Sequence, residues 1–101
     1  MPVSVTCQHR AMTAHLSGEI DHHGAREMME ALDRAIGDHL PLRLTLDLSG
    51  VTFMDSSGLA VLLRCKRRMD AVGGCVKAVA VPTQPRRVLD AAGLGRIIPL
   101  E

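Results

Sequence analysis

The fold is decided by residues 42–63, whose sequence is LRLTLDLSGVTFMDSSGLAVLL. In residues 42–48 leucine alternates with polar residues, and this period of two predicts a strand with one apolar face. The Ser-Gly pair at residues 49–50 predicts a turn after that strand. The polar corner DSSG, residues 55–58, precedes an apolar run, so we expect a helix over residues 57–71.

The N-terminal residues predict a β-hairpin. Apolar and polar side chains alternate in residues 3–7 and again in residues 12–16, and residues 9–10 between them suit a turn. The stretch that follows, residues 19–24, is polar and predicts a loop.

Residues 25–36 predict a helix, because apolar side chains recur there at helical spacing with charged residues on the opposite side. Asp21 or a neighbour can cap its start, since an aspartate side chain accepts hydrogen bonds from the unpaired N–H groups of a first turn. Gly37 can end it, because glycine readily adopts the left-handed conformation that follows many helices.

The last third of the chain predicts a further strand and a further helix. Residues 75–81 form an apolar run rich in β-branched residues. Thr83 can cap a short helix that continues through residue 92 and ends at Gly93. Residues 97–98 predict a short last strand.

This order of elements predicts an α/β fold with a mixed, mostly parallel sheet of four to five strands. Three helices are too few to cover both faces of such a sheet, so we expect them mainly on one face. A length of 101 residues predicts a single domain over residues 1–101.

Composition narrows the function classes. The net charge is +1 and Phe53 is the only aromatic residue, which disfavours nucleic acid as a partner because base stacking needs aromatic faces. Cys7, Cys65 and Cys75 are an odd number of cysteines without CxxC spacing, as in reduced thiols of a cytosolic protein. No apolar run has membrane-spanning length and no export signal is visible, so we expect a cytoplasmic protein without a membrane partner.

Ser56 has two interpretations from the residues alone. It can be a plain helix cap, which is the common role of serine at such a corner. Its hydroxyl can also carry a phosphate at the positive end of a helix, where free N–H groups would meet it and the added charge would act as a switch. Ser57 is expected to be a structural cap or a first-turn donor.

Two motifs carry a resemblance to a known family. The sequence GEIDHH, residues 18–23, and the sequence FMDSSGL, residues 53–59, occur in the order and at the separation found in STAS domains. The chain resembles in particular the bacterial anti-sigma factor antagonists of the sporulation SpoIIAA type. A weaker agreement lies in residues 92–94 and 97–98, AGL and II.

The resemblance implies a partner-switching cycle. The unphosphorylated antagonist would bind an anti-sigma factor that is also a serine kinase of the GHKL type, and this binding would release the sigma factor. The kinase would phosphorylate Ser56 and the complex would separate, until a serine phosphatase restores the hydroxyl. The expected partner-binding residues lie around the two motifs: Asp21, His22, His23, Met54, Asp55, Ser56, Ser57 and Gly58. We expect Met54 to be exposed near the corner.

The chain departs from the family pattern in two places. Gly24 stands where relatives commonly carry threonine or another residue with a side chain, and we expect it to loosen the loop. The sequence ends at Glu101, where relatives usually add a C-terminal helix, so we expect that helix to be missing.

Other function classes remain open beside this one. The chain could be an STAS module of a transporter or of a stress-response or other signalling complex with a different kinase; the GEIDHH motif and the lack of membrane segments argue against the transporter. It could be a phosphocarrier with phosphohistidine at His22 or His23, or a small hydrolase with Ser56 as nucleophile. The residues predict no enzyme, metal or cofactor, because the histidines lack zinc-ligand spacing and Ser56 lacks a G-x-S-x-G elbow.

Overall fold

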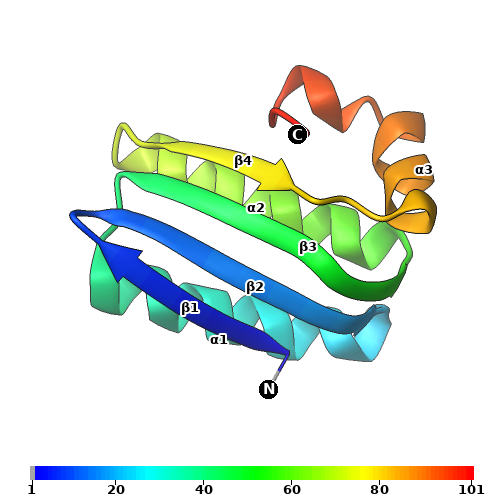
Figure 1. Ribbon diagram of the computed structural model, residues 1–101, viewed down its shortest axis with the longest axis horizontal. Coiled ribbons are helices and arrows are strands. Elements are labelled where there is room, and N and C mark those ends of the chain that lie inside the picture. The colour runs from blue at the N-terminus through cyan, green and yellow to red at the C-terminus, as the bar shows by residue number, and fades with distance from the viewer. Residues whose placement is uncertain (1) are drawn as a thin grey trace.

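The computed structural model describes residues 2–101, which form a mixed four-stranded sheet in the order β1-β2-β3-β4 (Figure 1). β1 is antiparallel to β2, whereas β2, β3 and β4 are parallel. This arrangement confirms the predicted α/β fold. The strands are β1 (Val3–Gln8), β2 (Ala11–Ile20), β3 (Arg43–Met54) and β4 (Cys75–Val79). The helices are α1 (His22–His39), α2 (Ser56–Ala71), α3 (Thr83–Ala91) and the short 3-10 helix η1 (Leu94–Arg96).

The two long helices, α1 and α2, lie against one face of the sheet, and α3 lies beyond the end of β4 (Figure 1). The prediction that helices group mainly on one face is therefore confirmed. The core between sheet and helices is aliphatic, as the alternation in β3 predicted, and each fully buried side chain of this kind stabilises the fold by about 1.5–3 kcal/mol. Its largest fully buried members are Met12, Leu16, Ile20, Met28, Leu32, Leu44, Leu46, Leu48, Met54, Leu62, Met69 and Leu89.

The side chain of Asp33 ties α1 to α2. Its carboxylate accepts hydrogen bonds from Arg64 at 2.8 Å and from Arg68 at 2.9 Å, both on α2. The Arg64 guanidinium is the main cause that lowers the pKa of Asp33 below its ordinary value. This contact lies past the first turns of both helices and joins their later turns.

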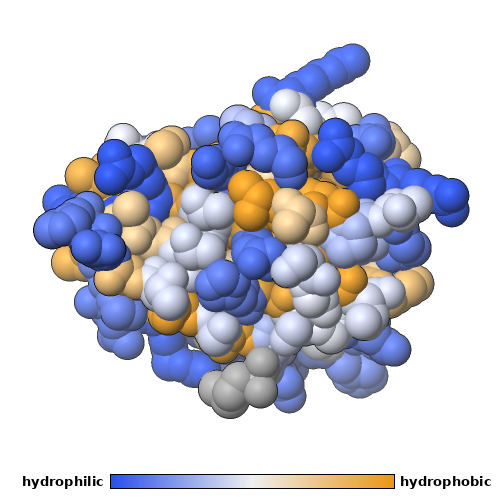
Figure 2. Space-filling view, in the orientation of Figure 1, coloured by the Kyte–Doolittle hydropathy of each residue, from blue (hydrophilic) through white to orange (hydrophobic). Residues whose placement is uncertain are grey.

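The other face of the sheet has no helix over it among the described residues, and Figure 2 shows hydrophilic and intermediate residues interspersed there with apolar ones. The strand register places Thr6, Thr13 and Thr45 side by side on neighbouring strands. Next to this row, His15 Nδ1 lies 2.8 Å from Asp47 Oδ2. The sheet thus has one apolar face, as predicted, and one mixed face.

The predicted turn at residues 49–50 is wrong, because β3 continues through it to Met54. Gly50 serves close approach between strands instead: a Cβ at this position would lie 3.0 Å from the carbonyl oxygen of Leu16 on β2. The register of the β2–β3 pair shifts next to this contact, between His15 and Ser17. The predicted loop over residues 19–24 is wrong as well, since β2 extends to Ile20 and α1 begins at His22.

Helix α1 does not end at Gly37 but continues to His39. Leu40 closes it in the left-handed conformation, with φ 49°, and donates its N–H to the carbonyl oxygen of Ile36. Pro41 explains this ending, because proline disfavours the helical conformation of the residue before it.

The C-terminal elements differ in two details from the prediction. Pro82 rather than Thr83 is the cap residue of α3, and no side chain forms a capping hydrogen bond there. Gly93 does end α3, with φ 68°. Residues 97–98 form no strand; the chain instead makes η1 and then a single parallel bridge between Leu100 and Ala78 of β4.

Cys65 is buried in α2, and this burial raises the pKa of its thiol to about 12. Cys7 is half-buried and Cys75 is exposed, and none of the three cysteines forms a disulfide in the described chain. No helix within residues 2–101 has both the length and the apolar character that crossing a membrane requires.

Candidate functional site

The two sequence motifs meet at one edge of the sheet, because β2 and β3 are parallel and end side by side. Ile20 pairs with Met54 at the ends of these strands. The next residues, Asp21 and Asp55, are the N-caps of α1 and α2. The N–H of Asp55 donates to the carbonyl oxygen of Ile20 at 3.3 Å, which links the β2–α1 corner directly to the β3–α2 corner.

Asp21 caps α1 as predicted. Its Oδ1 accepts a hydrogen bond from the N–H of Gly24 at 2.8 Å, and this bond is the main cause that lowers the pKa of Asp21. The N–H of Ala25 donates to the carbonyl oxygen of Asp21 at 2.8 Å. The carboxylate is therefore held in place with its charge at the edge of the sheet.

Gly24 tightens this corner instead of loosening it, so that prediction is wrong. A Cβ at Gly24 would collide with the carbonyl oxygen of Glu19, and it would also approach Asp21 Oδ1 at 3.4 Å. The first turn of α1 packs directly on the end of β2, and only glycine leaves room for this backbone contact.

The corner before α2 is capped by Asp55, not by a serine. Asp55 Oδ1 accepts from the N–H of Ser57 at 2.7 Å, and the carbonyl oxygen of Asp55 accepts from the N–H of Gly58 at 3.0 Å. Ser57 is thus a first-turn donor, as predicted. The interpretation of Ser56 as a plain cap is wrong, because Asp55 already occupies that position.

Ser56 is the first residue of α2 and is exposed. No other residue within 2–101 forms a hydrogen bond with its hydroxyl. Two of the expected free N–H donors are occupied, because the Ser57 and Gly58 N–H groups are bound to Asp55. The hydroxyl therefore lies at the positive end of α2 and forms no hydrogen bond that stabilises the described fold.

Met54 and Gly58 form the base of this corner. Met54 is fully buried, so the prediction that it is exposed is wrong. Its side chain lies beneath Gly58, where a Cβ would collide with it. The residue exposed next to it is Phe53, 41% accessible, because consecutive residues of a strand point to opposite faces.

His22 and His23 are exposed in the first turn of α1, and their rings make an edge contact with centroids 5.6 Å apart. A groove of about 240 Å³ runs between α1 and α2 beside them. It is lined by His22, Ala25, Arg26, Met29, Ser57 and Ala60. The described residues bring together no group of three His, Cys, Asp or Glu side chains that could hold a metal ion.

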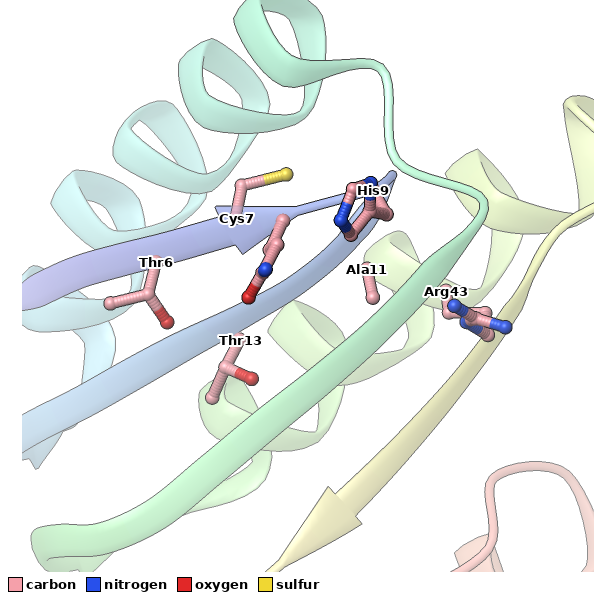
Figure 3. A pocket seen from close by; sticks show the side chains of 7 residues that line it. Thr6, Cys7, His9, Ala11, Thr13 and Arg43 are labelled. Atoms are coloured by element: carbon pink, nitrogen blue, oxygen red, sulfur yellow. The ribbon is translucent and has the colours of Figure 1, made fainter.

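A larger hollow has a volume of about 540 Å³, and Figure 3 shows the side chains that line it. Its lining comes from the hairpin end of the sheet and includes Thr6, His9, Thr13 and Arg43. β2 starts at this hollow and ends at Ile20, directly before Asp21, so the hollow is at the opposite end of the sheet from the capped corners.

Gln84 contacts the corner before α2, although no pattern in the sequence indicated it. This residue of α3 donates its side-chain amide N–H to the carbonyl oxygen of Met54 and accepts from the N–H of Met54, both at 2.8 Å. No local pattern could have revealed the contact, since the two residues are separated by 30 positions in the chain.

Comparison with known proteins agrees with this geometry. The family model of the STAS domain matches residues 2–101. An anti-sigma F factor antagonist from Paenibacillus polymyxa is 32% identical over 99% of this chain and 87% of its own length.

Two solved structures show the same architecture. An anti-sigma factor antagonist from Mycobacterium paratuberculosis superposes with a TM-score of 0.85 at 30% identity, covering 97% of this chain and 82% of that one. The anti-sigma factor antagonist SpoIIAA in its unphosphorylated form superposes with a TM-score of 0.81 at 25% identity, covering 98% and 87%. The motifs, the sheet order and these likenesses agree, and the chain belongs to the STAS domain family.

Proposed function

We propose that this chain is an anti-sigma factor antagonist controlled by phosphorylation of Ser56. The unphosphorylated form binds an anti-sigma factor that is a serine kinase of the GHKL type, and the sigma factor is released. Phosphorylation ends the binding, and a serine phosphatase restores it. The names of the similar proteins support the first part of this proposal, and SpoIIAA has been solved in both phosphorylation states.

The observation that carries the proposal is the state of the Ser56 hydroxyl. It is exposed, and within residues 2–101 it takes part in no hydrogen bond. A kinase can therefore reach it, and a phosphate added there breaks no contact of the fold. Asp55 keeps its capping bond to Ser57 in either state, so α2 does not depend on the modification.

Charge explains why binding is lost. A phosphoserine carries about −1.5 to −2 charges at neutral pH. A partner carboxylate about 5 Å away is repelled by roughly 3 kcal/mol per unit charge at an effective dielectric constant of about 20. The total of about 5 kcal/mol corresponds to a loss of affinity of roughly a thousandfold, before screening by salt reduces it. The Asp21 and Asp55 carboxylates make the same edge negative already.

The surface that binds the kinase can be assigned from the side chains that are accessible around Ser56. We assign direct contact to Asp21, Asp55 and Ser57 and to the two histidines, His22 and His23. Met54 and Gly58 support this surface from beneath, because both are buried. The groove between α1 and α2 offers room for an apolar side chain of the kinase, since Ala25, Met29 and Ala60 line it.

A protein with this role is a regulator and not an enzyme, because the kinase and the phosphatase carry the chemistry. It acts in the cytoplasm, where sigma factors meet RNA polymerase. A regulator of this kind requires no metal or cofactor of its own.

The test combines the purified chain with the anti-sigma kinase and ATP, followed by mass spectrometry of its peptides. We expect one phosphate on Ser56, none in Ser56→Ala, and an unchanged reaction in the matched control Ser4→Ala, which removes an exposed hydroxyl on β1. Ser56→Ala should still bind the kinase. A phosphate that persists in Ser56→Ala, or an acid-labile phosphate on His22 or His23, contradicts the proposal.

A further inference from the structure

β3 is longer than the strand beside it. Its pairing with β4 ends at Asp47 and Val79, so residues 48–54 have no strand neighbour on that side within the described chain. On the other side β2 stays paired with β3 up to Ile20 and Met54. The end of β3 therefore has one open edge, and buried backbone groups on such an edge need other partners.

The side chain of Gln84 supplies these partners to Met54. It accepts from the Met54 N–H and donates to the Met54 carbonyl oxygen, with both distances at 2.8 Å. A carboxamide can do both at once, as a backbone peptide group does in a sheet. Gln84 thus takes the place of the missing strand, and it comes from the second residue of α3.

Met54 is the residue directly before the Asp55 cap. Its backbone is held by Gln84 from α3, while the Asp55 N–H is held by Ile20 from β2. Its side chain supports Gly58 in the first turn of α2. The backbone that presents Ser56 is therefore fixed from both sides, and Figure 1 shows the start of α3 next to the connection between β3 and α2.

We propose that Gln84 is a positioning residue for Ser56: its amide pair with Met54 holds the corner in the geometry that phosphoryl transfer needs. This inference rests on the proposed function of Ser56. It adds that the position of α3 affects the reactivity of Ser56, although α3 contributes no residue to the capped corners.

The first experiment measures amide hydrogen exchange at Met54. In Gln84→Met the side chain keeps its length but loses both hydrogen bonds, so the Met54 amide should exchange about tenfold faster. Gln8→Met is the matched control, since Gln8 is exposed on β1 and the chemical change is the same. An unchanged Met54 exchange rate in Gln84→Met overturns the inference.

The second experiment measures phosphorylation of each variant by the anti-sigma kinase with radiolabelled ATP. Misplaced reacting groups slow the chemical step, so Gln84→Met should lower kcat by roughly 10- to 100-fold with little change in KM. Partial unfolding would act differently, because it removes folded substrate and raises the apparent KM without lowering kcat. Gln84→Glu serves as the second variant; it keeps the acceptor but loses the donor and should lie between Gln84→Met and the wild type.

The outcomes separate the two proposals. If the wild type is phosphorylated on Ser56 and Gln84→Met reacts with the same kcat, the positioning role of Gln84 is overturned and the proposed function stands. If the wild type itself gains no phosphate on Ser56, both proposals fail. A fall in kcat for Gln84→Met but not for Gln8→Met supports the inference.

Discussion

The corners at the ends of β2 and β3 use the same chemistry and differ in what they expose. Each strand ends in an aspartate that caps the following helix, Asp21 for α1 and Asp55 for α2. In the first corner the cap bond reaches Gly24, whose Cα packs on the carbonyl oxygen of Glu19. In the second it reaches Ser57 and leaves Ser56 exposed, above a buried methionine.

This difference in packing shows how two neighbouring corners can have different roles. The first packs backbone against backbone, so it has little freedom to move. The second rests on the flexible side chain of Met54 and is held from α3 by Gln84. Under the proposed function, the first corner is a fixed wall of the partner surface and the second carries the modification.

The largest expected effect comes from a charge on the second corner. Ser56→Asp should weaken binding to the anti-sigma kinase by about 100-fold, since one charge at about 5 Å costs roughly 3 kcal/mol. Titration calorimetry measures the affinity, with Ser56→Ala as the neutral control. His22→Asp adds a carboxylate at the first residue of α1 and should weaken binding less; equal losses would erase the distinction between the corners.

The second-largest expected effect is on the free energy of unfolding when a Cβ is added at the first corner. Gly24→Ala forces a Cβ against the carbonyl oxygen of Glu19 and should lower the free energy of unfolding by about 2–3 kcal/mol. The matched control is Gly37→Ala in the same helix, where a Cβ meets nothing within 4 Å. It should raise the free energy of unfolding by about 0.5–1 kcal/mol. Urea unfolding measures both, and a neutral Gly24→Ala would show that the first corner is not tightly packed.

A Cβ added at the second corner should lower the free energy of unfolding by less. Gly58→Ala meets the Met54 side chain rather than backbone, so its cost should be smaller, about 1–2 kcal/mol. A double-mutant cycle with Met54→Ala tests the cause, because the smaller side chain removes the collision. The two changes should couple favourably; strictly additive effects would mean that Met54 is not what Gly58 packs on.

The smallest expected effect is on the free energy of unfolding at low pH. The Gly24 hydrogen bond lowers the pKa of Asp21 below its ordinary value of 3.8. The stabilisation from ionised Asp21 is therefore present above about pH 4 and is lost as the pH falls through the folded-state pKa. Asp21→Asn keeps a capping oxygen but no charge, so its difference in unfolding free energy from the wild type should shrink below pH 3.8. A constant difference down to pH 2 contradicts this account.

Local patterns in the sequence were enough for the main elements. The leucine alternation in residues 42–48 predicted β3, and the capping preference of aspartate predicted that Asp21 can cap α1, although the helix begins three residues before the predicted Ala25. Both signals act over a few residues, so they are readable without a structure. The two motifs also predicted that Asp21 and Ser56 belong to one site, and the parallel pairing of β2 and β3 brings them to one edge.

The errors came from contacts between distant residues. Gly50 suggested a turn, but glycine is needed there because β2 approaches closely at Leu16. Met54 looked exposed beside a polar corner, yet the strand continues to it and directs it into the core. Gln84 gave no signal at all, because its role depends on β4 ending earlier than β3.

One consequence follows from the capping of α2 by Asp55 instead of Ser56. The helix gains no capping bond from the serine oxygen, so under the proposed function esterifying it and cleaving the ester break no capping bond of α2. If the proposed cycle operates, the same molecules should pass through many rounds of phosphorylation and dephosphorylation without unfolding. Each round of the proposed cycle would consume one nucleoside triphosphate, and protein turnover would limit how many rounds one molecule completes.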